Sequence, residues 1–202
     1  GTANIYYGNM SGFSNVSNYM TALGSSALRN SISASSQTGI GFQALYSATT
    51  GGYNTACGAN SLYENTTGTY NIAFGSYALN SNTTGAPNTA VGRSVLYANT
   101  TGPFNTAVGG TALFSNTTGS TNTAVGYQAG YTATTGNLLA IGYQAGYSSN
   151  TSTGYSPVFV GYQAGFNSTT GHSNVFVGTL TGYTNSSGSY NTALGSAALQ
   201  LS

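Results

Sequence analysis

Few side chains of this 202-residue chain could take part in acid–base, nucleophilic or metal chemistry. The candidates are a single histidine, a single cysteine and a single glutamate, His172, Cys57 and Glu64. Triads and acid–base pairs need such groups within mutual reach, and zinc or calcium needs several ligands. We therefore expect no enzymatic activity, no metal and no cofactor. We interpret Cys57 as a small buried apolar residue, His172 as a solvated residue after a turn, and Glu64 as a surface residue at a turn.

The charge of the chain excludes several classes of partner. Arg29, Arg93 and Glu64 are the only charged residues, whereas an ordinary domain is about 25% charged. We expect no nucleic-acid binding, because neutralising phosphates takes several Lys or Arg. We expect no membrane insertion, because no run reaches the ~18 apolar residues of a span. A net charge near zero promotes association, so the first expected partner is a second copy of the chain.

The element that must position any functional residue is a short repeat. An apolar pentad ending in glycine, in its clearest form Asn-Thr-Ala-Val-Gly, returns twelve times at a spacing of mostly 17 residues. The closing glycines, here called the repeat glycines, are Gly8, Gly24, Gly41, Gly58, Gly75, Gly92, Gly109, Gly126, Gly142, Gly161, Gly178 and Gly195. A fixed short period indicates stacked units rather than a globular fold with one unique site.

Each repeat, numbered from its glycine as zero, predicts two short strands and a turn. The apolar residue at −1 is expected in the core. Ala at +3 and Leu or Gly at +4 suggest a second strand, and Asn-Thr-Thr-Gly supplies turn chemistry. The chain is therefore predicted to be all-β, a parallel β-solenoid (β-roll) of about twelve 17-residue coils, roughly 55 Å long. Residues 1–202 form one repeat array, interpreted as part of a longer fibre. The asparagines at −4 (Asn54, Asn71, Asn88, Asn105 and Asn122) are expected to form a ladder with amide-to-amide hydrogen bonds.

Position +5 is aromatic in most coils and predicts a stripe of rings along the rod. Its members are Phe13, Tyr46, Tyr63, Tyr97, Phe114, Tyr131, Tyr147, Phe166 and Tyr183, and Arg29, Asn80 and Gln200 interrupt it. Exposed together, these rings would exceed the apolar patch of a normal monomer. Two interpretations follow: packing on each other and inside a subunit interface, or a stacking platform for sugars or another surface.

Asn-x-Ser/Thr tripeptides suggest glycosylation along the turn edge. They begin at Asn15, Asn65, Asn82, Asn99, Asn116, Asn150, Asn167 and Asn185. Glycans would add solubility to an almost uncharged rod. The alternative is that Asn-Thr-Thr is simply a favourable turn sequence, and glycans on successive coils, about 4.8 Å apart, would crowd one another.

The segments Asn122-Thr-Ala-Val-Gly-Tyr-Gln-Ala-Gly130 and Leu139-Ala-Ile-Gly-Tyr-Gln-Ala-Gly146 resemble the head repeats of trimeric autotransporter adhesins, and they are similar to repeats of bacteriophage tail fibres. The resemblance covers essentially the whole chain through a degenerate motif. It implies a left-handed parallel β-roll, three chains around a common axis, and binding to host surfaces or matrix. The 17-residue period is longer than is usual in such heads.

Three functions remain open from the sequence. The first is a structural and adhesive segment of an extracellular fibre, either a surface adhesin or a phage tail fibre. The chain would then lie at a cell surface or on a virion, and its expected partners would include cell-surface glycan or matrix. The second is a self-assembling, glycosylated extracellular filament, whose subunits stack end to end. The third is ice binding by the threonine row Thr66, Thr83, Thr100 and Thr117, which we rank last because Gly and Asn beside it favour a turn edge.

Overall fold

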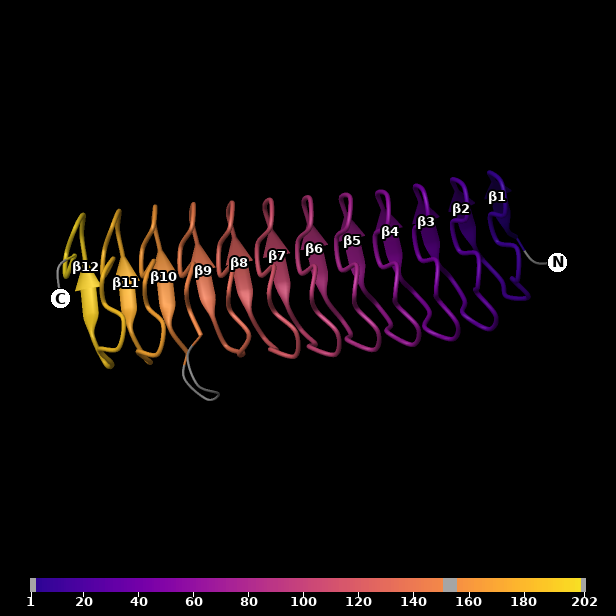
Figure 1. Ribbon diagram of the computed structural model, residues 1–202. Coiled ribbons are helices and arrows are strands. Elements are labelled where there is room, and N and C mark those ends of the chain that lie inside the picture. Colours follow the sequence, from indigo (N-terminus) through magenta and orange to yellow (C-terminus); the bar gives the residue numbers. More distant parts are fainter. Residues whose placement is uncertain (1–2, 151–155, 201–202) are drawn as a thin grey trace.

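The computed structural model describes residues 3–150 and 156–200 as a rod of stacked coils (Figure 1). Each coil contributes one three-residue strand that ends immediately before its repeat glycine. The strands are β1 (Ile5–Tyr7), β2 (Thr21–Leu23), β3 (Thr38–Ile40), β4 (Thr55–Cys57), β5 (Ile72–Phe74), β6 (Thr89–Val91), β7 (Thr106–Val108), β8 (Thr123–Val125), β9 (Leu139–Ile141), β10 (Val158–Val160), β11 (Val175–Val177) and β12 (Thr192–Leu194).

These strands form one parallel sheet in the order β1 to β12. Equivalent residues pair across every step, so that Thr89 of β6 aligns with Thr106 of β7 and Val91 aligns with Val108. The two ends of the chain lie at opposite ends of the rod (Figure 1). The predicted parallel β-solenoid with a repeat of about 17 residues is therefore confirmed.

The direction of the strand side chains corrects one expectation. Side chains alternate across a strand, and here the residue at −2 points inward whereas those at −3 and −1 point outward. In β6, Ala90 is fully buried, while Val91 is 38% exposed. The prediction that −1 belongs to the core is therefore wrong, and Cys57 accordingly is half-buried at −1 rather than enclosed.

The second strand predicted after each repeat glycine does not form. Residues at +2 and +4 have positive φ, for example Ser94 at 53° and Leu96 at 50°, which is incompatible with an extended strand. The chain instead makes consecutive turns whose N–H groups bond alternately to the two neighbouring coils. Ser94 N–H donates to Ser76 O at 2.9 Å, and Leu96 N–H donates to Ala112 O at 3.0 Å. The wall opposite the sheet is thus a ladder of turns with its backbone groups satisfied.

The core between sheet and turns is narrow, and its residues compensate one another in size. Ala at −2 and +3 and Leu at +4 fill most coils. Where β10 places the larger Phe159 at −2, the adjacent +4 positions are Gly146 and Gly165, and a Cβ on Gly165 would lie 2.4 Å from the Phe159 ring. Gly182 faces Phe176 of β11 in the same way. The alternation of Leu and Gly at +4 therefore follows from packing.

Backbone packing explains why the repeat glycine itself scarcely varies. Gly24 has a φ of 135°, a conformation that residues with a side chain rarely adopt. A Cβ there would also lie 2.4 Å from the carbonyl oxygen of Gly41 in the next coil. The glycines at this bend allow successive coils to stack closely.

The expected asparagine ladder at −4 is present and buried. Asn88 donates its backbone N–H to Asn71 Oδ1 at 2.9 Å and its Nδ2 to Gly102 O at 2.9 Å. Direct contact between the two amides is longer, with Asn88 Nδ2 at 3.3 Å from Asn71 Oδ1. The ladder therefore joins strands to turns mainly through the backbone, rather than through the amide-to-amide bonds we expected. None of the residues that the structure describes forms a helix able to cross a membrane.

Candidate functional site

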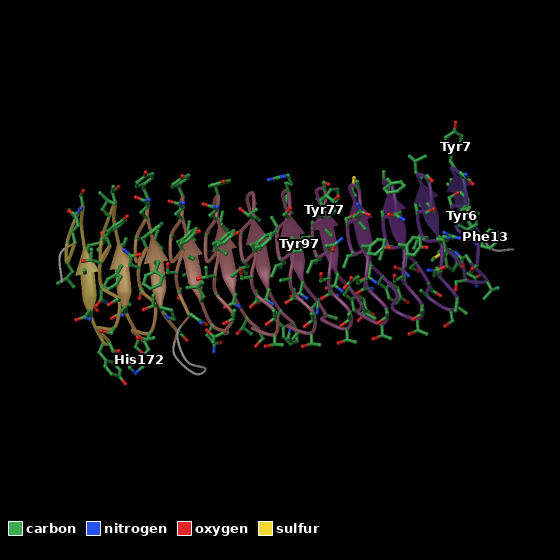
Figure 2. All side chains as sticks on the ribbon, viewed as in Figure 1. Tyr6, Tyr7, Phe13, Tyr77, Tyr97 and His172 are labelled. Carbon is green, nitrogen blue, oxygen red and sulfur yellow. The ribbon has the colours of Figure 1, made fainter. Side chains whose placement is uncertain are left out.

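The residues with conventional chemistry do not gather into one site. No group of three His, Cys, Asp or Glu side chains that could hold a metal occurs in residues 3–150 and 156–200. Cys57 lies on the outward side of β4, and Glu64 is exposed six residues beyond its repeat glycine. His172 is half-buried rather than fully solvated; its Nδ1 contacts Ser189 Oγ, and its ring lies 5.0 Å from that of Tyr190 (Figure 2). Any function therefore rests on repeated surfaces.

The predicted aromatic stripe at +5 is a stack of rings. Tyr97, Phe114, Tyr131, Tyr147, Phe166 and Tyr183 are stacked continuously, with centroids 4.9–5.2 Å apart and interplanar angles of 4–12°. Tyr46 and Tyr63 form a second stack at 5.1 Å. These rings are half-buried by one another, whereas Phe13, near the first coil, is 69% exposed.

The interruptions of the stripe have structural explanations. Arg29 donates from Nη1 to the Tyr46 hydroxyl at 3.1 Å and lies 5.7 Å from its ring centroid, so that a cation–π contact closes the stack. At Asn80, the next ring is Tyr77 of the same coil, which lies 6.4 Å from Tyr97 and is tilted by 54° (Figure 2). Gln200 lies beyond Tyr183, in the coil of β12.

Stacking decides what the stripe can bind. Rings about 5 Å apart cover each other's faces, and a sugar stacks on an aromatic face rather than on its edge. Within a stack, only the edges and hydroxyls of the rings reach solvent. The geometry favours the interpretation in which the rings pack on each other, and it argues against a sugar platform along the continuous stack.

The turn asparagines Asn65, Asn82, Asn99, Asn116 and Asn185 are buried, contrary to the outward edge expected for glycans. Asn99 Nδ2 donates to Asn82 Oδ1 at 2.8 Å and to Gly102 O at 3.0 Å. A glycan would replace one of the two hydrogens on that nitrogen and so remove one of these bonds, and it would need space in a buried turn. The glycosylation hypothesis therefore does not fit these five positions in the folded rod.

The other tripeptides differ. Asn150 is exposed, and Asn167 is half-buried. Asn15 is half-buried and donates Nδ2 to the Tyr6 hydroxyl at 2.6 Å. Partial burial raises the pKa of Tyr6 above its ordinary value. Sequence reasoning missed Asn9, which begins Asn-Met-Ser and is exposed.

The largest unpredicted surface is the outer face, defined as the outward side chains at −3 and −1 of β1–β12. The −1 row carries Tyr7, Leu23, Ile40, Cys57, Phe74, Val91, Val108, Val125, Ile141, Val160, Val177 and Leu194, each exposed or half-exposed. The −3 row is mostly threonine. One signal in the sequence could have revealed the outer face. The residue at −1 varies in size from Cys to Phe, as an exposed position can, whereas the residue at −2, the true core position, is mostly Ala.

A second unpredicted surface lies at +1, just beyond the repeat glycines. Tyr127, Tyr143 and Tyr162 are stacked with centroids 5.5 and 5.2 Å apart, and each is 43–50% exposed. Beside them, Gln144 Nε2 donates to Gln128 Oε1 at 2.7 Å, and Gln163 Nε2 donates to Gln144 Oε1 at 2.8 Å. Three successive coils thus hold their +1 rings in register.

Comparison with known proteins identifies no relative with this arrangement. No family model, no curated protein and no solved structure matches the chain. The function is therefore argued from the surfaces described above, and the resemblance to adhesin heads and tail-fibre repeats stays an expectation.

Proposed function

We propose that this chain is a structural and adhesive segment of an extracellular fibre, of the adhesin or phage tail-fibre type, in which copies associate side by side through the outer face. The observation that carries this proposal is the continuous apolar row at −1 on a chain with three charged residues. Such a row on a rod that lacks repelling charge favours contact with another copy.

The dimensions of the outer face support this assignment. At about 4.8 Å per strand the face is roughly 50 Å long, and two rows of side chains make it roughly 10 Å wide. The face therefore covers roughly 500 Å², in which the −1 row is apolar and the −3 row is mostly threonine.

The coil-to-coil hydrogen bonds support the mechanical part of the proposal. Every step of the rod combines sheet pairing, turn pairing and, in most coils, buried asparagines. A load along the rod would have to separate these bonds together. That is the property required of a fibre shaft, and it needs neither a cofactor nor a unique cleft.

Electron microscopy of the native particle tests the proposal. We expect discrete short particles, about 55 Å long per repeat array, each containing more than one chain. Long uniform filaments would instead support end-to-end self-assembly, the alternative raised by the sequence. Single isolated rods at micromolar concentration would contradict side-by-side association.

Ice binding is a second candidate, because a second set of threonines, other than the row suggested by the sequence, is aligned in register on the parallel sheet. The turn threonines are engaged: Thr66, Thr83 and Thr100 each donate Oγ1 to the carbonyl of the equivalent residue in the next coil. The −3 threonines instead lie on the sheet, in the runs Thr21, Thr38, Thr55 and Thr89, Thr106, Thr123. A thermal-hysteresis assay decides this candidate: activity lost in Thr106→Val would support it, and no activity in the wild-type chain would remove it.

A further inference from the structure

The +1 row contains one empty position between a charged residue and a stack of rings. Arg93, Gly110 and Tyr127 occupy +1 in successive coils, and Tyr143 and Tyr162 continue the row. Thr111 N–H donates to Arg93 O at 2.9 Å, and Gln128 N–H donates to Gly110 O at 3.0 Å, which keeps these coils in step. The ring of Tyr127 therefore has a stacked neighbour on one side and a glycine on the other.

The position at Gly110 carries no side chain and has room for a Cβ atom. A Cβ added there would meet only Tyr127, at 3.4 Å from Cδ2 and 3.7 Å from Cε2, which is ordinary van der Waals contact. Two coil steps separate the backbones of Arg93 and Tyr127, about 10 Å at the usual strand spacing. Neighbouring tyrosines of this row take 5.2–5.5 Å per step. The gap therefore accommodates one ring between the two side chains.

The guanidinium of Arg93, beside this gap in the +1 row, is available to bind an anion. Arg93 is exposed, and in the part of the chain that the structure describes its guanidinium has neither an ion pair nor a ring partner. Arg29, the other cation, is committed to Tyr46. A guanidinium presents paired N–H donors that match a carboxylate.

We propose that the gap at Gly110, bounded by Arg93 and Tyr127, binds a pyranose ring that carries a carboxylate. The sugar ring lies on the free face of Tyr127, and its carboxylate accepts hydrogen bonds from Arg93. This inference rests on the adhesive part of the proposed function and names its receptor class, an acidic sugar. The position next to Tyr127 in the +1 row is a glycine, so that no side chain of that row covers this face of the ring.

Titration calorimetry with methyl β-D-glucuronide as the probe tests the assignment on the full chain. Neutral methyl β-D-glucoside measures stacking alone, and benzoate measures a planar carboxylate without a sugar. We expect the glucuronide to bind at least about tenfold more tightly than the glucoside, as a charged hydrogen bond implies. Arg93→Gln should reduce glucuronide affinity to that of the glucoside, whereas Arg29→Gln should leave it unchanged.

Gly110→Tyr should abolish the binding of both sugars by filling the gap with a ring of the protein itself. Gly110→Ala, which adds only the Cβ, provides a milder variant if the tyrosine disturbs folding, and Tyr162→Leu serves as the control at the other end of the row. Glucuronide binding that survives in Gly110→Tyr, equal affinity in Arg93→Gln, or binding of benzoate alone would overturn the proposal, as would no detectable binding of either sugar. The mass of the native particle is independent of these variants, so failure here is distinguishable from failure of the fibre proposal.

Discussion

Replacing Asn99 by alanine tests whether the buried turn asparagines hold the coils together. The Asn99 amide makes three hydrogen bonds: it donates to Asn82 Oδ1 and Gly102 O, and its Oδ1 accepts from Asn116 Nδ2. After truncation, Asn116 Nδ2 keeps Gly119 O as a partner, and Gly102 O keeps Asn88 Nδ2. Asn82 Oδ1, which accepts from Asn99 Nδ2 in the native rod, loses that donor.

The expected cost follows from these contacts. A net contribution of about 1 kcal/mol per hydrogen bond, plus the penalty for one unsatisfied buried acceptor, gives a loss of roughly 2–4 kcal/mol in the free energy of unfolding. Asn116 provides a matched comparison, because its Oδ1 has no partner in the described structure. Asn116→Ala removes two bonds and takes the donor from Asn99 Oδ1, as Asn99→Ala does from Asn82 Oδ1. It also removes the buried unpaired oxygen of Asn116, and it breaks one bond fewer, so it should cost about 1–2 kcal/mol less than Asn99→Ala.

Urea unfolding of the two variants measures the difference. Thr118→Ala, at an exposed position of the turn that begins at Asn116, controls for a general effect of substitution in a turn. It should change the free energy of unfolding by less than about 0.5 kcal/mol. If Asn99→Ala were no more destabilising than Asn116→Ala, the ladder of amides would not contribute as described.

Three further predictions concern packing, charge and modification. Gly165→Leu should lower the free energy of unfolding by about 1–3 kcal/mol through overpacking against Phe159. Adding Phe159→Ala to the same chain should recover part of that loss. If urea unfolding showed the two substitutions to be additive, the proposed size compensation would be contradicted. The free energy of unfolding should change by less than about 0.5 kcal/mol between roughly 0.01 and 0.15 M salt, because surface ion pairs contribute little even where they exist; a large salt dependence would refute this. Peptide mapping of the native protein should find any N-linked glycan at exposed asparagines such as Asn9 or Asn150, and a glycan on a buried turn asparagine would show that the turn is open.

The period of the repeat was enough to predict the solenoid, because only stacking identical units in register places the same residue types in continuous rows. The direction of the side chains was harder to predict. An aliphatic residue at −1 indicates burial by type, but strand alternation gives the inward position to the smaller alanine at −2, as Ala90 and Val91 show.

The turn wall could not be predicted because it depends on an unusual backbone. Leucines such as Leu79, Leu96 and Leu113 adopt positive φ, which non-glycine residues seldom do, so an Ala-Leu-aromatic run suggests a strand. The burial of the turn asparagines depends on the same wall. Of the candidate surfaces, the +5 rings were predicted as a row, whereas the outer face and the gap at Gly110 became visible only once each coil had been placed.

The solution mass of the chain tests the central claim, association through the outer face, most directly. Light scattering after size-exclusion chromatography should give a small multiple of the 20.3 kDa chain mass for the wild-type protein. Val108→Asp, in the middle of the −1 row, should give a single chain, because a buried unpaired carboxylate is costly at an interface. Thr118→Asp, at the exposed turn, should leave the assembly intact. A wild-type monomer, or an assembly unchanged by Val108→Asp, would contradict the account.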